Sequence, residues 1–258
     1  MSEVLFYVGL HQPSDGQHFG RACISWRRLL GRKKPLGCGE VLIDSGAFTE
    51  VVKHGGYRSS VAEYAAALRR LHADGVATIV GAVAQDYMCE PIALESTGLT
   101  IIEHQKLTIE RYDLLVAEDL PFPILPVLQG YAPEDYVRHI EMYGDRLKPD
   151  MWVGVGSVCK RNGDPARIVE VLSAIHAARA DLRLHGFGIK LTALSHPGVR
   201  ALLYSADSMA WSDAARKQGR NANSWTEAAR YCDAVGIAIA LPPAPWQMPL
   251  PLSNRRAA

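Results

Sequence analysis

Short runs of apolar residues alternate along the chain with longer segments in which apolar residues recur at helical spacing. Seven of the short runs have the length and composition of β-strands. Alternation of this kind is typical of parallel βα units. The predicted strands are residues 5–10, 41–45, 78–83, 124–128, 151–155, 184–189 and, more weakly, 202–209.

The helical segments between the strands begin with recognisable start signals. Ser60 and Glu63 form a capping box at the start of one predicted helix, and Thr100 and Glu103 form a second. Asp164 stands at a predicted N-cap, directly before a proline and a run of apolar residues at helical spacing. These helices are amphipathic, as the outer layer of a βα fold requires.

The length of 258 residues permits one (β/α)8 barrel, which needs about 250 residues. An eighth strand could lie at residues 234–240, although that segment also has the pattern of the buried end of a helix. A doubly wound open sheet is the main alternative, but no G-x-G-x-x-G motif follows the first strand. We therefore predict an α/β fold with a single TIM-type barrel over residues 1–240. The proline-rich tail, residues 241–258, is predicted to be extended.

Composition narrows the classes of partner and compartment. Hydrophobic residues make up 48% of the chain and the formal net charge is +1, so a nucleic acid would have to bind to a local basic surface. The five cysteines include no C-x-x-C pair and indicate neither a disulfide framework nor a local zinc site. We expect no membrane span and no signal peptide, because the apolar runs are too short. These features favour the cytoplasm.

Polar residues and glycines close most of the predicted strands. In a parallel barrel the active site lies at the carboxyl ends of the strands, so these residues are the candidates for function. A single aspartate there could simply cap the next helix, but three carboxylates at one mouth are costly to bury and favour a functional role. The strand-end residues are Asp44-Ser45-Gly46, Gln85-Asp86, Gln129-Gly130, Gly156-Ser157, Lys190 and Asp207-Ser208.

Four of these segments resemble, in the same order, motifs of the tRNA-guanine transglycosylases. They are residues 44–48 (DSGAF), 128–130 (LQG), 155–158 (VGSV) and 207–211 (DSMAW). The similarity is closer to the paralogous deazapurine DNA transglycosylases and extends over most of the chain. It is carried by residues 85–91, 126–130, 154–159 and 184–188.

The resemblance implies a base exchange in DNA. Guanine would leave a nucleotide flipped out of the duplex, and a 7-deazaguanine, expected to be 7-cyano-7-deazaguanine, would take its place. Asp207 would be the nucleophile that forms a covalent glycosyl-enzyme intermediate, and Asp44 the general acid and base. No cofactor is implied, and helper proteins that open the duplex would be further partners. Nothing in the sequence indicates an oligomeric state.

The same resemblance assigns residues to the base. Asp86 and Gln129 would hydrogen-bond the purine edge, helped by the backbone near Gly156. Phe48 and His185 would stack on the two faces of the ring. The full set of expected base-binding residues is Ser45, Gly46, Phe48, Asp86, Gln129, Gly156, Ser157 and His185.

One departure from the tRNA enzymes concerns zinc. They carry a C-x-C-x2-C segment and a histidine after the nucleophile, whereas only Cys232 follows Asp207 here. We therefore predict no metal, and the missing segment, which helps to seat tRNA, favours DNA as the substrate. Basic residues could hold phosphates, although each could also be ordinary surface charge. The candidates are Arg216, Lys217 and Arg220, with Arg27, Arg28, Arg32, Lys33 and Lys34.

Three other functions remain open from the sequence. The nearest is a tRNA-guanine transglycosylase. Lys190, which closes a predicted strand, could form a Schiff base in an aldolase-type reaction. A barrel that binds a nucleobase without catalysis is the third.

Overall fold

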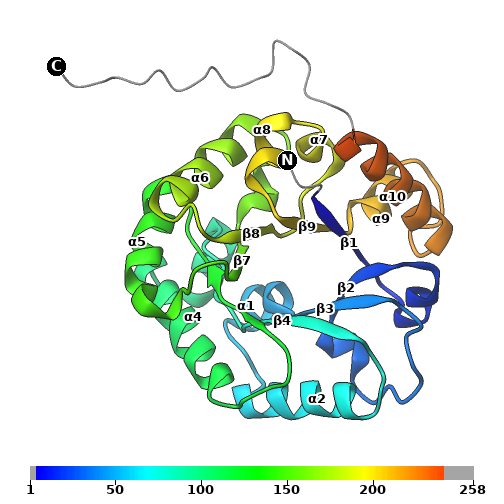
Figure 1. Ribbon diagram of the computed structural model, residues 1–258, viewed down its shortest axis with the longest axis horizontal. Helices are drawn as coiled ribbons and strands as arrows, with labels where there is room; N and C mark the ends of the chain where they lie inside the picture. Colours follow the sequence, from blue (N-terminus) through cyan, green and yellow to red (C-terminus); the bar gives the residue numbers. More distant parts are fainter. Residues whose placement is uncertain (1–3, 241–258) are drawn as a thin grey trace.

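The computed structural model describes residues 4–240, in which the strands form a single parallel sheet wrapped into a barrel (Figure 1). The strand order is β5-β4-β3-β2-β1-β9-β8-β7-β6, and every neighbouring pair is parallel. The strands are β1 (Leu5–Gly9), β2 (Arg21–Ser25), β3 (Glu40–Asp44), β4 (Ile79–Val83), β5 (Ile124–Leu125), β6 (Val127–Leu128), β7 (Trp152–Val155), β8 (Arg183–Gly186) and β9 (Ser205–Ser208).

The two ends of this sheet are halves of one strand. Only Pro126 separates β5 from β6, and proline has no N–H to donate to a ladder. The Pro126 carbonyl oxygen still accepts a hydrogen bond from the Gly154 N–H at 2.9 Å, so the strand continues across the break. β5 pairs with β4, and β6 pairs with β7. If β5 and β6 are taken as one strand, residues 4–240 contain the eight parallel strands of a TIM-type barrel, as predicted.

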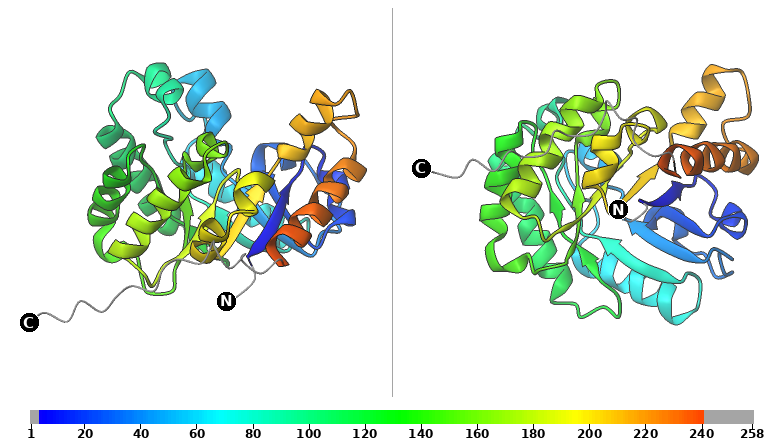
Figure 2. Two further views of the ribbon diagram at one scale, coloured as in Figure 1. Left: turned by 90° about the horizontal axis from the view of Figure 1, so that it is seen from above. Right: turned by 45° about the horizontal axis from the view of Figure 1, so that its top comes forward.

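The sequence-based prediction missed one strand, and the segment that it left open between a strand and a helix is a helix. β2 was not predicted, because it begins with an arginine and contains only one β-branched residue, Ile24. The alternative of a strand at residues 234–240 is wrong, because that segment ends α10 (Trp225–Ala240). The buried residues of α10 are Ala228, Val235 and Ala238, which recur at helical spacing. α10 and the neighbouring α9 stand beside β1 and β9 (Figure 2).

The predicted helices form the outer layer, and both capping boxes are confirmed. Ser60 Oγ accepts from the Glu63 N–H at 3.1 Å, and the Glu63 carboxylate accepts from the Ser60 N–H at 2.7 Å. Thr100 and Glu103 repeat this geometry. Asp164 is at the predicted N-cap, but its side chain makes no capping hydrogen bond. The helices before α10 are α1 (Ala47–His54), α2 (Val61–Ala73), α3 (Pro91–Thr97), α4 (Ile101–Val116), α5 (Pro133–Tyr143), α6 (Pro165–Ala178), α7 (Leu191–Leu194), α8 (Pro197–Leu202) and α9 (Ala210–Lys217).

Short 3-10 turns replace α-helices in part of the ring. After β1 and β2 the chain forms only η1 (Pro13–His18) and η2 (Trp26–Leu29), so the strict βα alternation begins at β3. Two further turns are η3 (Gly144–Arg146) and η4 (Val158–Arg161). No helix within residues 4–240 is long and apolar enough to cross a membrane. The predicted tail, residues 241–258, lies outside the described residues.

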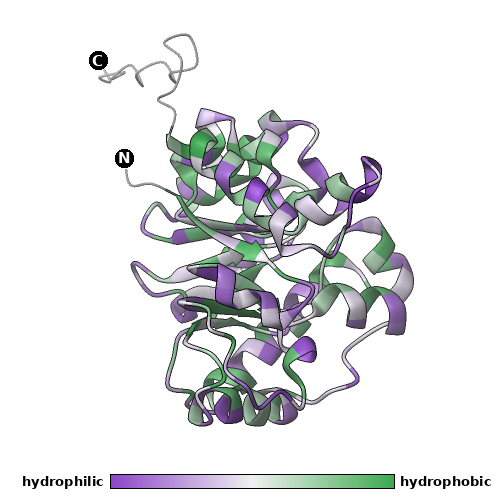
Figure 3. Cartoon of the chain, turned by 90° about the vertical axis from the view of Figure 1, so that its right-hand side faces the viewer, coloured by the Kyte–Doolittle hydropathy of each residue, from purple (hydrophilic) through white to green (hydrophobic). Residues whose placement is uncertain are grey.

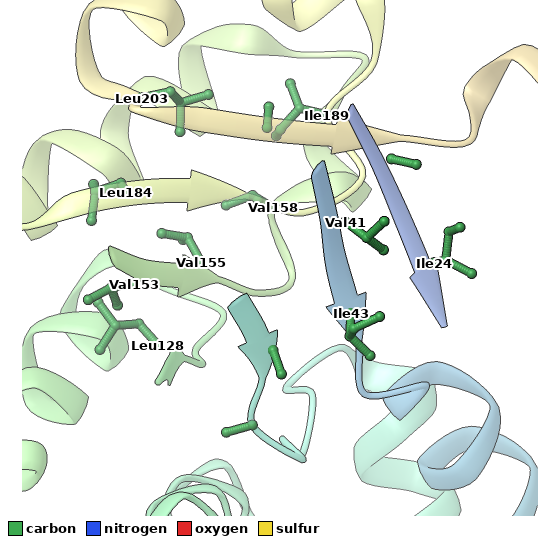
Figure 4. Packing of buried hydrophobic residues seen from close by; sticks show 14 of the residues in the cluster. Ile24, Val41, Ile43, Leu128, Val153, Val155, Val158, Leu184, Ile189 and Leu203 are labelled. Atoms are coloured by element: carbon green, nitrogen blue, oxygen red, sulfur yellow. The ribbon is translucent and has the colours of Figure 1, made fainter. Parts of the chain in front are cut away.

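Alternation along the strands separates two cores. Ile24, Val41 and Ile43 point outward and pack in the large cluster beneath the helices (Figure 4), while Cys23 and Leu42 belong to a smaller cluster inside the barrel. Hydrophilic residues lie mainly on the helices and loops around the strands (Figure 3). Because side chains alternate with a period of two, the next inward positions after Cys23 and Leu42 are those of Ser25 and Asp44. Polar side chains therefore follow the apolar interior at the carboxyl end.

Candidate active site

A pocket of about 640 Å³ opens at the carboxyl ends of the strands. Residues that follow β1, β2, β3, β4, β6, β7, β8 and β9 all contribute to its wall. Most of the residues that the sequence nominated meet here although they are far apart in the chain. The nominated residues in the wall are Asp44, Gly46, Phe48, Asp86, Gln129, Gly156, Ser157 and Asp207.

Asp207, on β9, is held by one of its two carboxylate oxygens. Oδ1 accepts a hydrogen bond from the Gly188 N–H at 3.1 Å and lies 3.3 Å from His185 Nε2. Among the described residues, no hydrogen bond occupies Oδ2, and the side chain keeps 15% of its exposure. A carboxylate fixed at one oxygen and open at the other is oriented for nucleophilic attack.

Ser205 fixes the orientation of the His185 ring. Ser205 Oγ accepts from the Trp152 indole N–H at 2.7 Å and lies 2.9 Å from His185 Nδ1. Since the indole can only donate, the Ser205 hydroxyl is free to donate to Nδ1, which leaves the histidine proton on Nε2. This tautomer donates to Asp207, so His185 orients the carboxylate.

Asp44 closes β3 and holds its carboxylate close to its own backbone. Oδ2 accepts from the Gly46 N–H at 3.0 Å, where Gly46 has the left-handed φ of 76° that a side chain would disfavour. Burial, and then the negative charge of Asp207, raise the pKa of Asp44 to about 6. The hydrogen bonds from Gly46 and the Ser25 hydroxyl partly oppose this rise. Asp44 can therefore gain or lose a proton near neutral pH, as a general acid and base must.

Asp86 and Gln129 form a connected polar network deeper in the pocket. Asp86 Oδ2 accepts from Gln129 Nε2 at 2.5 Å, and Asp86 Oδ1 accepts from the Ser45 hydroxyl at 3.2 Å. Gln129 Oε1 in turn accepts from the Ser157 hydroxyl at 3.1 Å. Burial, and then the charge of Asp44, raise the pKa of Asp86 to about 7.

Gly156 is required for the position of this network. A Cβ added at Gly156 would lie 2.2 Å from Gln129 Nε2, which is too close for any real contact. The next residue, Ser157, adopts a left-handed φ of 61°, an uncommon value for a residue other than glycine. The chain thus bends sharply between β7 and η4 and leaves room for Gln129.

Two nominated residues lie behind the pocket wall and not in it. Ser45 is fully buried and supports Asp86 through its hydroxyl. His185 is also fully buried, so the expectation that its ring stacks on a base is not met. It pairs in register with Ser205, one layer below Asp207, because Asp207 is the next inward residue of β9. Phe187, two residues along from His185, lines the pocket instead.

The basic candidates fall into different regions. Arg32 and Lys33 are not at the mouth: the Arg32 carbonyl oxygen accepts from Arg70, near the end of α2, and the nearby Leu36 N–H pairs with Val76, before β4 begins. This places the loop at the amino end of the barrel. Arg216 and Lys217 lie on α9 and pair with Asp213, and Arg220 pairs with Glu227 at 3.1 Å.

Other residues of the pocket had no role in the base exchange assigned from the sequence. Arg27, one of the candidate phosphate contacts, lines the mouth and pairs with the buried Glu50 at 2.9 Å. The guanidinium of Arg58, with a smaller contribution from Arg27, lowers the pKa of Glu50 to about 2, so the ion pair holds Arg27 in place. Glu90 and Cys159 also line the wall. Both occur in the segments that carry the family resemblance, but nothing in their local sequence marks a role.

Two alternatives can be tested against this geometry. Lys190 is exposed and does not line the pocket, so the arrangement gives no support to a Schiff-base enzyme. Within residues 4–240 no group of three or more histidine, cysteine, aspartate or glutamate side chains could hold a metal ion. The pocket instead combines one open carboxylate with a second that titrates near neutral pH, the pair required for double displacement at a glycosidic carbon.

A protein-family model matches most of the chain. The family model described as "DpdA: DeoxyPurine in DNA protein A" matches residues 1–235. No curated protein matches the sequence.

Proposed function

The chain belongs to the DpdA family, whose members insert 7-deazaguanine into DNA, and on this premise we propose that it exchanges the base by double displacement at Asp207. One observation carries the proposal. Asp207 and Asp44 face one pocket, where burial and then the charge of Asp207 raise the pKa of Asp44. In the first half of the reaction, Asp207 Oδ2 attacks C1′ of the target nucleotide, and the bond from C1′ to N9 of guanine breaks.

Asp44 moves the proton in both halves. The protonated carboxyl gives its proton to the departing guanine. Esterification removes the negative charge of Asp207, so the pKa of Asp44 falls as the ester forms and proton release becomes easier. In the second half, Asp44 takes the N9 proton of the incoming 7-deazaguanine, N9 attacks C1′, and the Asp207 carboxylate is released.

Asp86 and Gln129 are the proposed readers of the purine edge. They are almost fully buried, and the hydrogen bonds to Ser45 and Ser157 hold both in place before a base arrives. A prearranged pair of a carboxyl and an amide can offer both donors and acceptors to the edge of guanine. By resemblance to the family, the incoming base is 7-cyano-7-deazaguanine.

The rim of the pocket has the features expected of a surface that holds a flipped nucleotide. Arg27 and Arg28 line the mouth, Lys160 lies 5.3 Å above the Phe48 ring, and Arg161 lies 4.8 Å from the Tyr131 ring. Phe48 and Tyr131 are about half exposed, at 49% and 46%. Cations attract the phosphates, and exposed aromatic rings can stack on unpaired bases.

The proposal is tested by supplying labelled guanine with duplex DNA or with tRNA. We expect label in DNA. Asp207→Asn should reduce exchange by at least about a thousandfold, because the ester can no longer form. The wild type should also retain labelled DNA on a denaturing gel, and Asp207→Asn should not. Asp145→Asn, an exposed aspartate far from the mouth, is the matched control and should behave as the wild type. Label that entered only tRNA would instead support the tRNA enzyme, and turnover in Asp207→Asn would remove the nucleophile.

A further inference from the structure

Glu90 is a buried carboxyl that the proposed reaction does not use. It precedes α3, is only 3% exposed and lines the pocket. Its Oε2 atom has no hydrogen-bond partner among the described residues, and Oε1 lies 4.0 Å from the Cys159 thiol, a weak contact. Burial raises the pKa of Glu90. An unsatisfied buried carboxyl costs free energy, so its retention in the wall of a pocket points to a ligand group that satisfies it.

The position of Glu90 follows from the order of contacts around the wall. Asp86 bonds Gln129, and Gln129 bonds Ser157. The Ser157 hydroxyl lies close enough to Glu90 to oppose the rise of its pKa, and Glu90 contacts Cys159. The wall therefore runs from Asp86 through Gln129 to Glu90.

The same wall continues to the nucleophile. A Cβ added at Gly188 would lie 2.9 Å from Cys159 Cβ, so these two residues touch, and the Gly188 N–H bonds Asp207. The perimeter of a 7-deazaguanine runs in the matching order, from N2 and N1 to O6, to position 7 and finally to N9. In the proposed arrangement, Asp86 and Gln129 bind the edge that carries N2, N1 and O6, and Asp207 lies beyond N9. Position 7 of the base then lies between Gln129 and Gly188.

We infer that Glu90 and Cys159 form the subsite for the substituent at position 7, and that Glu90 hydrogen-bonds a nitrogen of that substituent. The inference rests on the proposed base exchange and adds the residue that selects among 7-deazaguanines. An ionised Glu90 can accept from an ammonium or amidinium group, and a neutral Glu90 can donate to a nitrile. Unsubstituted 7-deazaguanine presents only a C–H bond there and leaves Oε2 unpaired. Burial raises the pKa of the Cys159 thiol to about 11, so Cys159 serves as a neutral wall.

The test measures kcat/KM for incorporation of 7-aminomethyl-7-deazaguanine, 7-cyano-7-deazaguanine and 7-deazaguanine into duplex DNA. In Glu90→Gln the ratio of kcat/KM for the aminomethyl base to kcat/KM for the cyano base should fall by about tenfold or more, because an amide can donate to a nitrile but carries no charge for an ammonium. Glu95→Gln, the same change at an exposed site on α3, should keep the wild-type ratio. A purely structural role for Glu90 would slow both bases equally and leave the ratio unchanged, which would overturn the inference.

A second variant covers the case in which Glu90→Gln does not fold. Cys159→Val adds a branch to the wall and should lower the preference for the aminomethyl base over 7-deazaguanine by about tenfold. An unchanged ratio there would also overturn the subsite. The proposed function fails separately: a wild type that incorporates none of the three bases contradicts base exchange itself.

Discussion

Replacing Asp86 by asparagine should make the stability of the protein less sensitive to pH between about 4 and 7. Asp86 is 6% exposed, and burial and then Asp44 raise its pKa from 3.8 to about 7 in the folded protein. Below pH 3.8 the group is protonated in both states. Between the two pKa values only the unfolded chain ionises, so stability falls as pH rises and the loss is complete above about pH 7.

The size of the effect follows from the shift. A shift of roughly three pKa units corresponds to about 4 kcal/mol when Asp86 is fully ionised. Roughly 3 kcal/mol of this falls between pH 5 and pH 8. The asparagine amide can keep the network, because Gln129 can turn its own amide so that Oε1 accepts from the new side chain and Nε2 donates to Ser157.

Urea unfolding at pH 5 and pH 8 measures this difference. The free energy of unfolding of the wild type should fall by about 3 kcal/mol more than that of Asp86→Asn over this interval. Asp145→Asn, which is exposed, should follow the wild type at both values. An Asp86→Asn variant that shows the same pH dependence as the wild type would refute the raised pKa. The same variant should lose base exchange, as expected if the buried carboxyl is kept for function at the expense of stability.

Two further variants test the geometry of the mouth. Gly156→Ala should reduce base exchange by more than about tenfold while DNA affinity, measured by a gel shift, stays within about twofold, because the new methyl group displaces Gln129 and leaves the rim intact. Arg161→Glu should weaken DNA binding by about tenfold at low salt and reduce its salt dependence, whereas Arg32→Glu, at the amino end of the barrel, should leave both unchanged; equal losses in the two variants would show that the rim is not the DNA-binding surface.

Local patterns predicted most of the barrel because each βα unit carries its own signals. The capping boxes at Ser60 and Thr100 and the apolar runs of β3 and β4 depend on neighbouring residues alone. β2 has no such signal: Arg21–Ser25 is a strand because β1 and β3 pair with both its edges, a tertiary effect that overrides weak local preference. The position of Arg32 and Lys33, away from the mouth of the pocket, could not be predicted for a related reason. Their loop passes to the far end of the barrel, and no local pattern records the direction of a loop.

The depth of each side chain in the barrel was predictable in principle from strand periodicity. This depth decides which residues line the pocket and which lie in the layer beneath it. In a closed barrel, residues two apart on one strand occupy successive layers of the interior. His185 is in register with Ser205, so it must lie one layer below Asp207, and Phe187 must lie one layer higher, at the level of Asp207. Motif similarity alone places His185 beside the base, whereas register places it beneath Asp207, the proposed nucleophile. A residue such as Glu90, which enters the wall from a loop after β4, has no register, and only the folded contacts reveal it.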